Sequence, residues 1–506
     1  MKKNWLSVFV ALLLLAFLAA PVSAWQGRMA GAGDAYGLIE DESDYLTHPA
    51  VIAMSKGFNA YGHYRLTYTK TSDWDYTVSL PSGPYLYPFK AGGDEWKNEG
   101  LLGAAFKLGA GMMGMFFEYT SIRGDYDGSA LYDGVFASGF NTYDMQHKLD
   151  DYALRLIYGL PVGAVNLGAE VQIAYRNEEK ETLLVEDDGD FYLNFPFGAE
   201  GIIESTLFPY MIPYKSKYWE AQGKVSVAGT MGAAKYALTF KGGFPFASDN
   251  KYTAGYYDGS TLDCQDAEGK VKGYNVGGDF WLRVPVNAKV ALPFVVSAGY
   301  KKVTRDGDFA SPSGLLISYI SYEHEAEYMN VGVGGGVDFT PAKGTKVAAG
   351  LYYDYIRTSQ KATFDYIDSG SNTFYDDYPD MPTQTEHRLT LKALAEKELT
   401  STLAVRGGFN VFYGYVEADY ATRHIYNGVF EPDYKFDISA DGYNAGANAS
   451  VGATFKLDKV ALEPFLNAGY VKYSVDGDGL HGFAGPINGE NDKADWHVGG
   501  GLSVRF

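Results

Sequence analysis

Apolar and polar residues alternate along most of this chain, in segments of ten residues or more. In the segment 164–176, every second residue from Val165 to Tyr175 is apolar, whereas Glu170, Gln172 and Arg176 fall between them. A period of two places the two sets on opposite faces of a β-strand. The alternation therefore predicts half-buried strands, which belong either to a soluble sandwich or to a membrane barrel.

The connections between these segments separate the two architectures, because short and long connections alternate strictly. Seven are short turns, such as Pro161-Val162-Gly163, and eight are long. Short turns at one end and long loops at the other are typical of outer-membrane barrels, in which closure satisfies every backbone group. The predicted strands span 58–70, 100–109, 113–123, 147–160, 164–176, 216–229, 233–244, 270–284, 289–303, 322–339, 345–357, 384–398, 401–417, 442–457, 460–475 and 493–506.

The fold predicted from this pattern is all-β: a closed antiparallel transmembrane β-barrel of about sixteen strands, within a range of fourteen to eighteen, with a short N-terminal plug. The longest connection, 177–215, carries an apolar stretch between 191 and 213. Because large apolar patches mark interfaces, this stretch predicts an ordered loop. The loop would lie in the lumen, at the outer mouth or against a neighbouring protomer.

The N-terminus has the features of a secretory signal peptide. Lys2 and Lys3 precede an apolar run over 5–20, and small residues lead to Ala24. The run is shorter than the roughly 20 residues of a spanning helix. The predicted organisation is a signal peptide over 1–24, a plug or hatch segment over 25–56 and a transmembrane barrel over 57–506. The predicted location is integral to the outer membrane of a Gram-negative envelope.

The segment 25–56 does not alternate. Its pattern Arg28-x-x-Gly31-x-Gly33-x-Ala35, followed by Pro49-Ala50-x-Ile52-Ala53, resembles the start of the mature FadL/TodX family of outer-membrane transporters for hydrophobic compounds. In that family an N-terminal hatch lies inside a fourteen-stranded barrel. The resemblance marks Arg28, Gly31, Gly33 and Pro49 as plug residues. His48 and Val51 stand where the family has the Asn and Gly of an Asn-Pro-Ala-Gly run.

The C-terminal strand alternates from Trp496 to a terminal Phe506. This ending resembles the β-signal by which barrel-assembly machinery recognises outer-membrane proteins, so that machinery is an expected partner. Outer-membrane lipid and lipopolysaccharide are further expected partners, together with small-molecule solutes. The pattern leaves a homo-oligomer open.

Composition and charge exclude several classes of protein. The formal net charge is −20, which opposes nucleic-acid binding because phosphates require a cationic face. The single cysteine, Cys264, excludes a disulfide framework. The eight histidines are scattered, without HExxH or CxxCH, so the sequence predicts no catalytic residue, no metal site, no cofactor and no enzyme.

Charged residues of both signs fall on the predicted inner faces, and barrels of about 16–18 strands leave an aqueous lumen unless it is filled. The sequence thus favours a channel for passive diffusion of small hydrophilic solutes. It would prefer cations, because the connection 125–144 holds four Asp and no base. The alternatives are FadL-like uptake of hydrophobic compounds and a non-conducting structural or partner-sheathing barrel. The predicted pore-lining residues are Arg65, Glu118, Arg155, Glu170, Arg176, Glu220, Lys224, Asp279 and Arg283.

Overall fold

The structure, a computed structural model, describes residues 26–32, 37–79, 89–133, 138–187, 214–257, 262–309, 317–368, 373–426, 429–430, 436–481 and 485–506. The predicted signal peptide lies outside these ranges, as does the apolar stretch 191–213. Within them, no helix is long and apolar enough to cross a bilayer.

Three short helices precede the strands: α2 (Gln26–Gly31) and the 3-10 helices η1 (Glu42–Leu46) and η2 (Pro49–Met54). The strands are β1 (Asn59–Ser79), β2 (Phe89–Leu108), β3 (Gly111–Asp133), β4 (Ser138–Val162), β5 (Val165–Asp187), β6 (Tyr214–Met231), β7 (Ala234–Tyr257), β8 (Leu262–Gly269), β9 (Val271–Pro285), β10 (Val290–Phe309), β11 (Ile317–Ala342), β12 (Thr345–Asp368), β13 (Thr373–Glu398), β14 (Leu403–Tyr426), β15 (Val429–Phe430), β16 (Phe436–Leu457), β17 (Val460–His481) and β18 (Gly485–Arg505).

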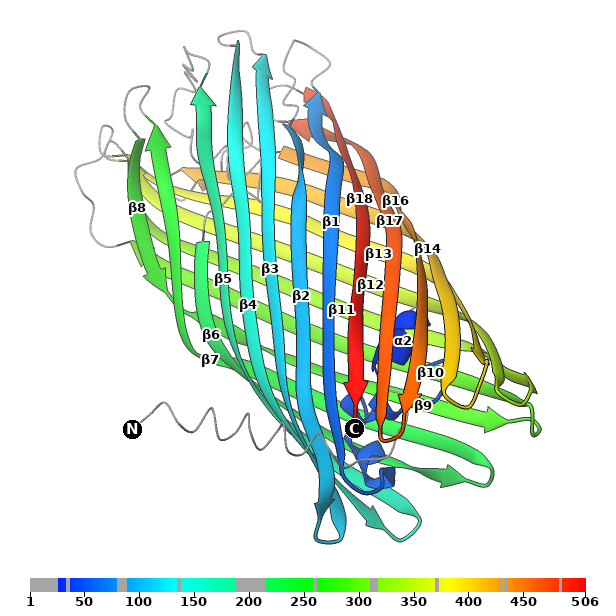
Figure 1. Cartoon of the computed structure of the whole chain (residues 1–506). Helices are drawn as coiled ribbons and strands as arrows, with labels where there is room; N and C mark the ends of the chain where they lie inside the picture. Colours follow the sequence, from blue (N-terminus) through cyan, green and yellow to red (C-terminus); the bar gives the residue numbers. More distant parts are fainter. Residues whose placement is uncertain are drawn as a thin grey trace.

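The strands form one closed antiparallel barrel (Figure 1). The sheet closes because β1 pairs with both β2 and β18. Strands β8 and β9 are one strand interrupted at Lys270, since both pair with β7 and β10. The two-residue β15 pairs with β14 alone, and β14 also pairs directly with β16. The barrel wall therefore has sixteen strands, which confirms the predicted fold and strand number.

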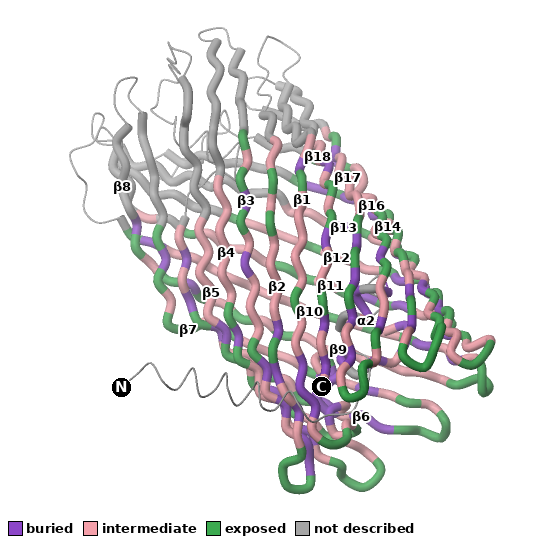
Figure 2. The backbone as a smooth tube through the Cα atoms, in the orientation of Figure 1, coloured by how far each residue is buried: buried purple, intermediate pink, exposed green. Residues whose placement is uncertain are grey.

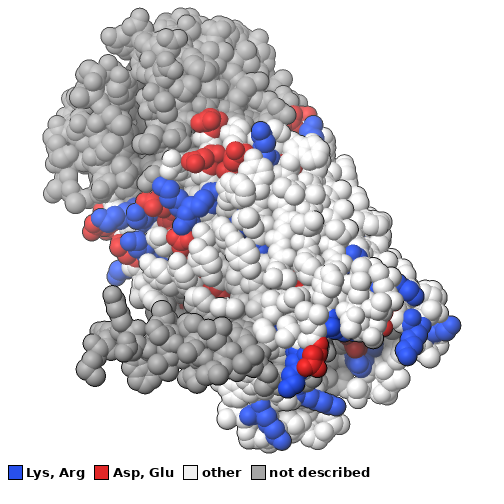
Figure 3. Space-filling model, viewed as in Figure 1, with Lys and Arg blue, Asp and Glu red and all other residues white. Residues whose placement is uncertain are grey.

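Large apolar side chains cover the outer face of the wall, and ion-paired side chains lie on its inner face. On β5, Val171 exposes 56% of its surface, whereas the adjacent Glu170 exposes 2%. A soluble sandwich would show the opposite arrangement, because its apolar face forms the core. Exposed positions alternate with less exposed ones along the wall (Figure 2), and the visible middle of the barrel carries few charges (Figure 3). This outer apolar surface is the one that a lipid bilayer covers.

The strands extend further at their loop ends than the sequence analysis predicted. The predicted strand 113–123 belongs to β3, which continues to Asp133, and residues 177–187, predicted to begin the longest loop, continue β5. The acidic run 125–127 is paired in register with 92–94. Backbone pairing continues there without a regular apolar–polar alternation, which is required only where one strand face contacts lipid. The ends at the short turns lie within a few residues of the predictions.

Residues 26–32 and 37–56 lie inside the barrel at the end of the short turns, near the C-terminus (Figure 1). There η2 contacts β3, β4, β5, β6 and β7, while α2 contacts β14, β16, β17 and β18. A segment that contacts strands on both sides of a closed wall occupies the lumen. We call residues 26–32 and 37–56 the hatch.

Candidate functional site

The hatch owes its local structure to capping groups rather than to long helices. Asp41 caps η1: its Oδ1 accepts hydrogen bonds from the backbone N–H of Ser43, at 3.0 Å, and from the Ser43 hydroxyl, at 2.7 Å. Asp44 completes a capping box by accepting the backbone N–H of Asp41 at 3.0 Å. Pro49 begins η2, a position where its missing N–H has no cost. These contacts fix a compact fold in a segment too short for stable isolated helices.

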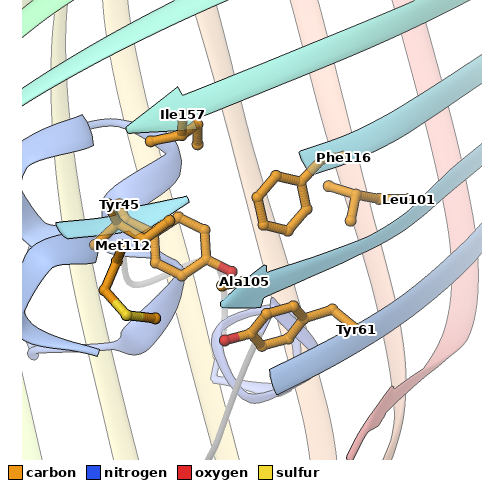
Figure 4. Packing of buried hydrophobic residues seen from close by; sticks show 8 residues of the cluster. Tyr45, Tyr61, Leu101, Ala105, Met112, Phe116 and Ile157 are labelled. Carbon is orange, nitrogen blue, oxygen red and sulfur yellow. The ribbon is translucent and has the colours of Figure 1, made fainter. Parts of the chain in front are cut away.

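Two apolar clusters join the hatch to the wall. In one, Tyr45 and Ile52 of the hatch pack with Tyr61, Phe116 and Ile157 of the wall, and each of these residues is fully buried (Figure 4). The rings of Tyr45 and Phe116 have their centroids 5.6 Å apart. In the second cluster, Met29, Leu38 and Ile39 pack against Ala348, Tyr352 and Leu394. Burial of this kind contributes about 1.5–3 kcal/mol for each large apolar side chain.

Inner-wall glycines allow the hatch to approach the strands closely. A Cβ atom at Gly168 of β5 would lie less than 3.0 Å from backbone atoms of Pro49 and Ala50. A Cβ atom at Gly408 of β14 would meet the backbone of Ala32 equally closely. Side chains at these wall positions would exclude the hatch from its present place. The wall and the hatch are therefore matched in shape on two sides of the lumen.

Ion pairs anchor one end of the hatch. Arg28 binds Glu396 of β13 through two hydrogen bonds, Nε to Oε2 at 2.9 Å and Nη2 to Oε1 at 3.1 Å. Its Nη1 also lies 3.3 Å from Asp41 Oδ2. Arg406 of β14 lies 3.3 Å from Glu396 and 3.8 Å from Glu463. Arg406 and Glu463 are buried, Arg28 and Glu396 are largely shielded from water, and a bidentate arginine–carboxylate pair fixes orientation as well as charge.

A second ionic network surrounds the backbone of Leu46. Arg155 lies 3.0 Å from Glu118 and 3.6 Å from Glu170, and Lys224 lies 3.1 Å from Glu170. Arg155 and Lys224 also donate hydrogen bonds to the carbonyl oxygen of Leu46, at 3.1 and 2.7 Å. Four of the predicted lumen residues thus meet at the hatch. They hold the end of η1, whose carbonyl groups carry partial negative charge.

The other predicted lumen residues also lie on the inner face, each with a wall partner. Arg283 joins Asp338 at 2.5 Å and reaches Glu40 of the hatch at 3.6 Å. The remaining four have partners within the wall: Arg65 with Glu99 at 4.0 Å, Arg176 with Asp151 at 2.6 Å, Glu220 with Asn275 at 2.8 Å and Asp279 with Lys241 at 2.8 Å. Their role in lining a conducting pore stays a prediction.

Of the predicted plug residues, Arg28 and Pro49 have defined contacts, Gly31 ends α2, and Gly33 lies outside the described residues. Sequence reasoning missed Glu396, Arg406 and Glu463, the wall partners of Arg28. The alternation of β13 could have placed Glu396 on the inner face, because it lies in the same row as Glu386, Arg388 and Lys392. Pairing across the lumen could not be read from that row.

Burial shifts the pKa values of Asp44 and His48, two titratable groups of the hatch. Burial, followed by the charge of Asp41, raises the pKa of Asp44 to about 8. Burial lowers the pKa of His48 to about 4, and His48 Nδ1 lies 2.8 Å from the Thr239 hydroxyl. Both groups are therefore neutral at pH 7, because burial outweighs the opposite charges of Arg28 near Asp44 and of Asp279 near His48.

Neither a protein-family model nor a curated protein sequence matches the chain. Solved structures of similar fold include the Pseudomonas putida toluene transporter TodX, with 10% identity, a TM-score of 0.40 and coverage of 96% of this chain and 98% of that one. A Pseudomonas aeruginosa FadL homologue has 12% identity, a TM-score of 0.40 and coverage of 96% and 99%. The Ralstonia pickettii toluene transporter TbuX has 10% identity, a TM-score of 0.37 and coverage of 94% and 98%.

The solved structures include members of the family that residues 28–53 resemble. The closed barrel with its apolar outer face points to the outer membrane of a bacterium, where single-chain barrels of this kind occur.

Proposed function

We propose that this chain is an outer-membrane transporter for small hydrophobic compounds, and that the hatch closes the periplasmic end of its barrel. The observation that carries the proposal is the way the hatch is attached to the barrel wall. The hatch is joined to opposite sides of the wall by apolar packing, close glycine contacts and ion pairs. A lumen filled in this way is suited to gated transport.

The same observation weighs against passive diffusion of hydrophilic solutes. Free diffusion requires a continuous aqueous path. The hatch contacts β3–β7 on one side of the lumen and β14 and β16–β18 on the other. The charged inner residues offered as pore lining are also engaged, since Arg155, Lys224 and Arg283 contact the hatch. Cation preference would therefore apply only to a barrel from which the hatch had moved.

The substrate class comes from the resemblance of residues 28–53 to transporters of hydrophobic compounds. The names of the solved structures refer to toluene and to monoaromatic hydrocarbons as substrates of those proteins. We extend that class to this chain as a hypothesis, and chlorobenzene is a suitable probe because it is a neutral substituted aromatic ring.

The proposal is tested in intact Gram-negative cells and in planar bilayers. Cells that produce the protein should take up radiolabelled chlorobenzene faster than cells with an empty vector. The purified full-length protein should show no sustained open conductance at neutral pH. Steady, cation-selective conductance by the unmodified protein, without faster chlorobenzene uptake, would favour the diffusion channel. Neither conductance nor uptake would favour a structural barrel.

A further inference from the structure

Exposed lysines lie at the short-turn end of the barrel, each at a different turn. They are Lys107, Lys289, Lys343, Lys397 and Lys459, and we call them the lysine rim. Acids are scarce there: within two residues of these turns the chain carries only Glu398 and Asp458. Glu398 lies 3.5 Å from Lys456, which is not part of the rim. The rim is therefore a cationic belt on an acidic protein.

The protein does not neutralise the charges of the lysine rim. Among the residues that the structure describes, no carboxylate lies within ion-pair distance of a rim lysine. Lys397 Nζ instead donates a hydrogen bond to the Thr345 hydroxyl at 2.7 Å, and Lys289 Nζ donates one to the Pro341 carbonyl oxygen at 3.4 Å. These neutral acceptors orient the ammonium groups without cancelling their charge, which leaves the charge available to an external anion.

Large apolar side chains are exposed beside the same lysines. Within three residues of a rim lysine lie Leu108, Val286, Leu399 and Leu457, each with at least half of its surface exposed. Exposed apolar surface that recurs in this way marks a contact with lipid or protein. At a membrane interface, the aliphatic stem of lysine covers apolar surface while its ammonium group reaches the polar layer. The turns combine both features that such an interface requires.

The height of the turns on the barrel places them at a lipid head-group layer. At the loop end of β2, Trp96 is exposed and packs against Tyr68, with ring centroids 4.7 Å apart. Aromatic side chains of this kind lie at a membrane interface. From Trp96 to Leu108 the outer face of β2 spans about 30 Å along the barrel axis, given the usual rise and tilt of barrel strands. The apolar band of such barrels is about 25 Å tall, so Leu108 and the rim lie at the opposite interface.

We propose that the lysine rim binds anionic phospholipid head groups of the periplasmic leaflet, with phosphatidylglycerol as the probe ligand. Lysine binds phosphate as a compact point charge, and several lysines near one anionic surface act together. The loop end of the outer face is unsuited to this role, because β14 and β16 expose Glu417, Asp419 and Asp441 there. The inference is independent of the proposed transport, since it involves neither the hatch nor the lumen.

The test is native mass spectrometry of the full-length protein in detergent with equal amounts of phosphatidylglycerol and phosphatidylethanolamine. Both lipids carry a phosphate, but only phosphatidylglycerol has a net negative charge. The unmodified protein should retain mainly phosphatidylglycerol. Replacing all five rim lysines by glutamine should lower the ratio of bound phosphatidylglycerol to phosphatidylethanolamine at least about fivefold, the factor expected for one lysine at an anionic surface.

The matched control removes the same amount of charge from the loop-end half of the barrel. It replaces by glutamine the exposed lysines Lys70, Lys251, Lys270, Lys272 and Lys361. Its lipid ratio should stay that of the unmodified protein. An equal fall in both variants would overturn the rim as the binding site. A ratio near one in the unmodified protein would overturn the choice of ligand and favour an acidic periplasmic protein as the partner.

A second measurement keeps every rim lysine and therefore does not depend on the folding of the multiple variant. Leu457→Cys, in the Cys264→Ser background, is labelled with bimane and reconstituted into vesicles. Brominated phosphatidylglycerol should quench the bimane more strongly than brominated phosphatidylcholine at the same concentration. Replacing Lys459 and the other rim lysines by glutamine should remove this difference. Equal quenching by the two lipids with the rim intact would contradict the proposed binding.

Discussion

At the scale of single residues, Arg28 is the side chain on which the position of the hatch most depends. Its guanidinium spans Glu396 of the wall and Asp41 of the hatch, and the side chains of Arg28 and Glu396 expose only 15% and 17% of their surfaces. Without Arg28, Glu396 would keep Arg406 at 3.3 Å, but the hatch would lose its ionic link to β13 and the buried Asp41 would lose its cation.

We therefore expect Arg28→Met to loosen the hatch without unfolding the barrel. Leak conductance in planar bilayers should rise, while the heat-dependent shift on gels should stay that of a folded barrel. Arg123→Met is the control, because Arg123 pairs with Asp150 on an exposed face, where such pairs contribute about 0–1 kcal/mol. A leak that is the same in the two variants would contradict the anchoring role.

Asp44 and His48 make the hatch sensitive to pH in opposite directions. Asp44 faces Asp41, Glu40 and Arg28, and its pKa is raised from 3.8 to about 8 in the docked hatch. Between these values the docked state keeps a proton that a released hatch loses, so docking weakens as pH rises. His48 is near Asp279, Lys224 and Lys241, and its pKa is lowered from 6.5 to about 4. Between those values docking strengthens as pH rises.

The two effects oppose each other up to pH 6.5, and above it only the effect of Asp44 remains. We expect leak conductance to change little from pH 4 to 6.5 and to increase from pH 6.5 to 8. In Asp44→Asn the increase should vanish, because asparagine stays neutral and still accepts the hydrogen bond from the Asp41 N–H. An increase that survives this substitution would assign the pH response to other groups.

At the scale of elements, the inner face of β5 is shaped for η2. At Gly168 of β5, a Cβ atom would lie 2.0 Å from the backbone nitrogen of Ala50. Gly168→Val should therefore displace η2 and raise leak conductance, because backbone atoms of the hatch cannot move aside as a flexible side chain can. Gly223→Val on the adjacent β6 is the control, since a Cβ there meets only the Glu170 carbonyl oxygen at 3.8 Å. If hydrogen exchange of residues 42–54 is unchanged in Gly168→Val, the close approach of η2 to β5 is not needed to hold the hatch in place.

At the scale of the whole molecule, charge is distributed unevenly. The chain has a net charge of −20, yet exposed lysines gather at the short turns, and Figure 3 shows part of this basic region at the lower end of the barrel. These lysines are Lys107, Lys289, Lys343, Lys397 and Lys459. The arrangement gives the periplasmic rim a local charge opposite to that of the molecule.

Orientation follows from the barrel and can be tested by cysteine labelling of intact cells in the Cys264→Ser background. Asp187→Cys, at the loop end of β5, should react with an impermeant reagent from outside. Ala342→Cys, at the short turn after β11, should react only once the outer membrane is opened. The reverse pattern would invert the proposed topology.

The alternation in the sequence predicted a closed barrel of about sixteen strands and which residues of each strand share a face. A period of two is a local property, and lipid on one face enforces it over about ten residues for each strand. The same locality explains what the pattern missed. Residues 124–133 and 177–187 extend their strands beyond the alternating segments. Only backbone pairing holds these extensions in the sheet, and the sequence pattern does not reveal that pairing.

What fills the lumen depends on contacts between residues that are far apart in the sequence. Arg28 and Glu396 are separated by 368 positions, and Glu118, Arg155, Glu170 and Lys224 come from four different strands. Inner residues that suggest an aqueous wall when considered strand by strand become anchors of the hatch once the sheet closes. Closure sets the distances across the lumen, and no period in the sequence records those distances.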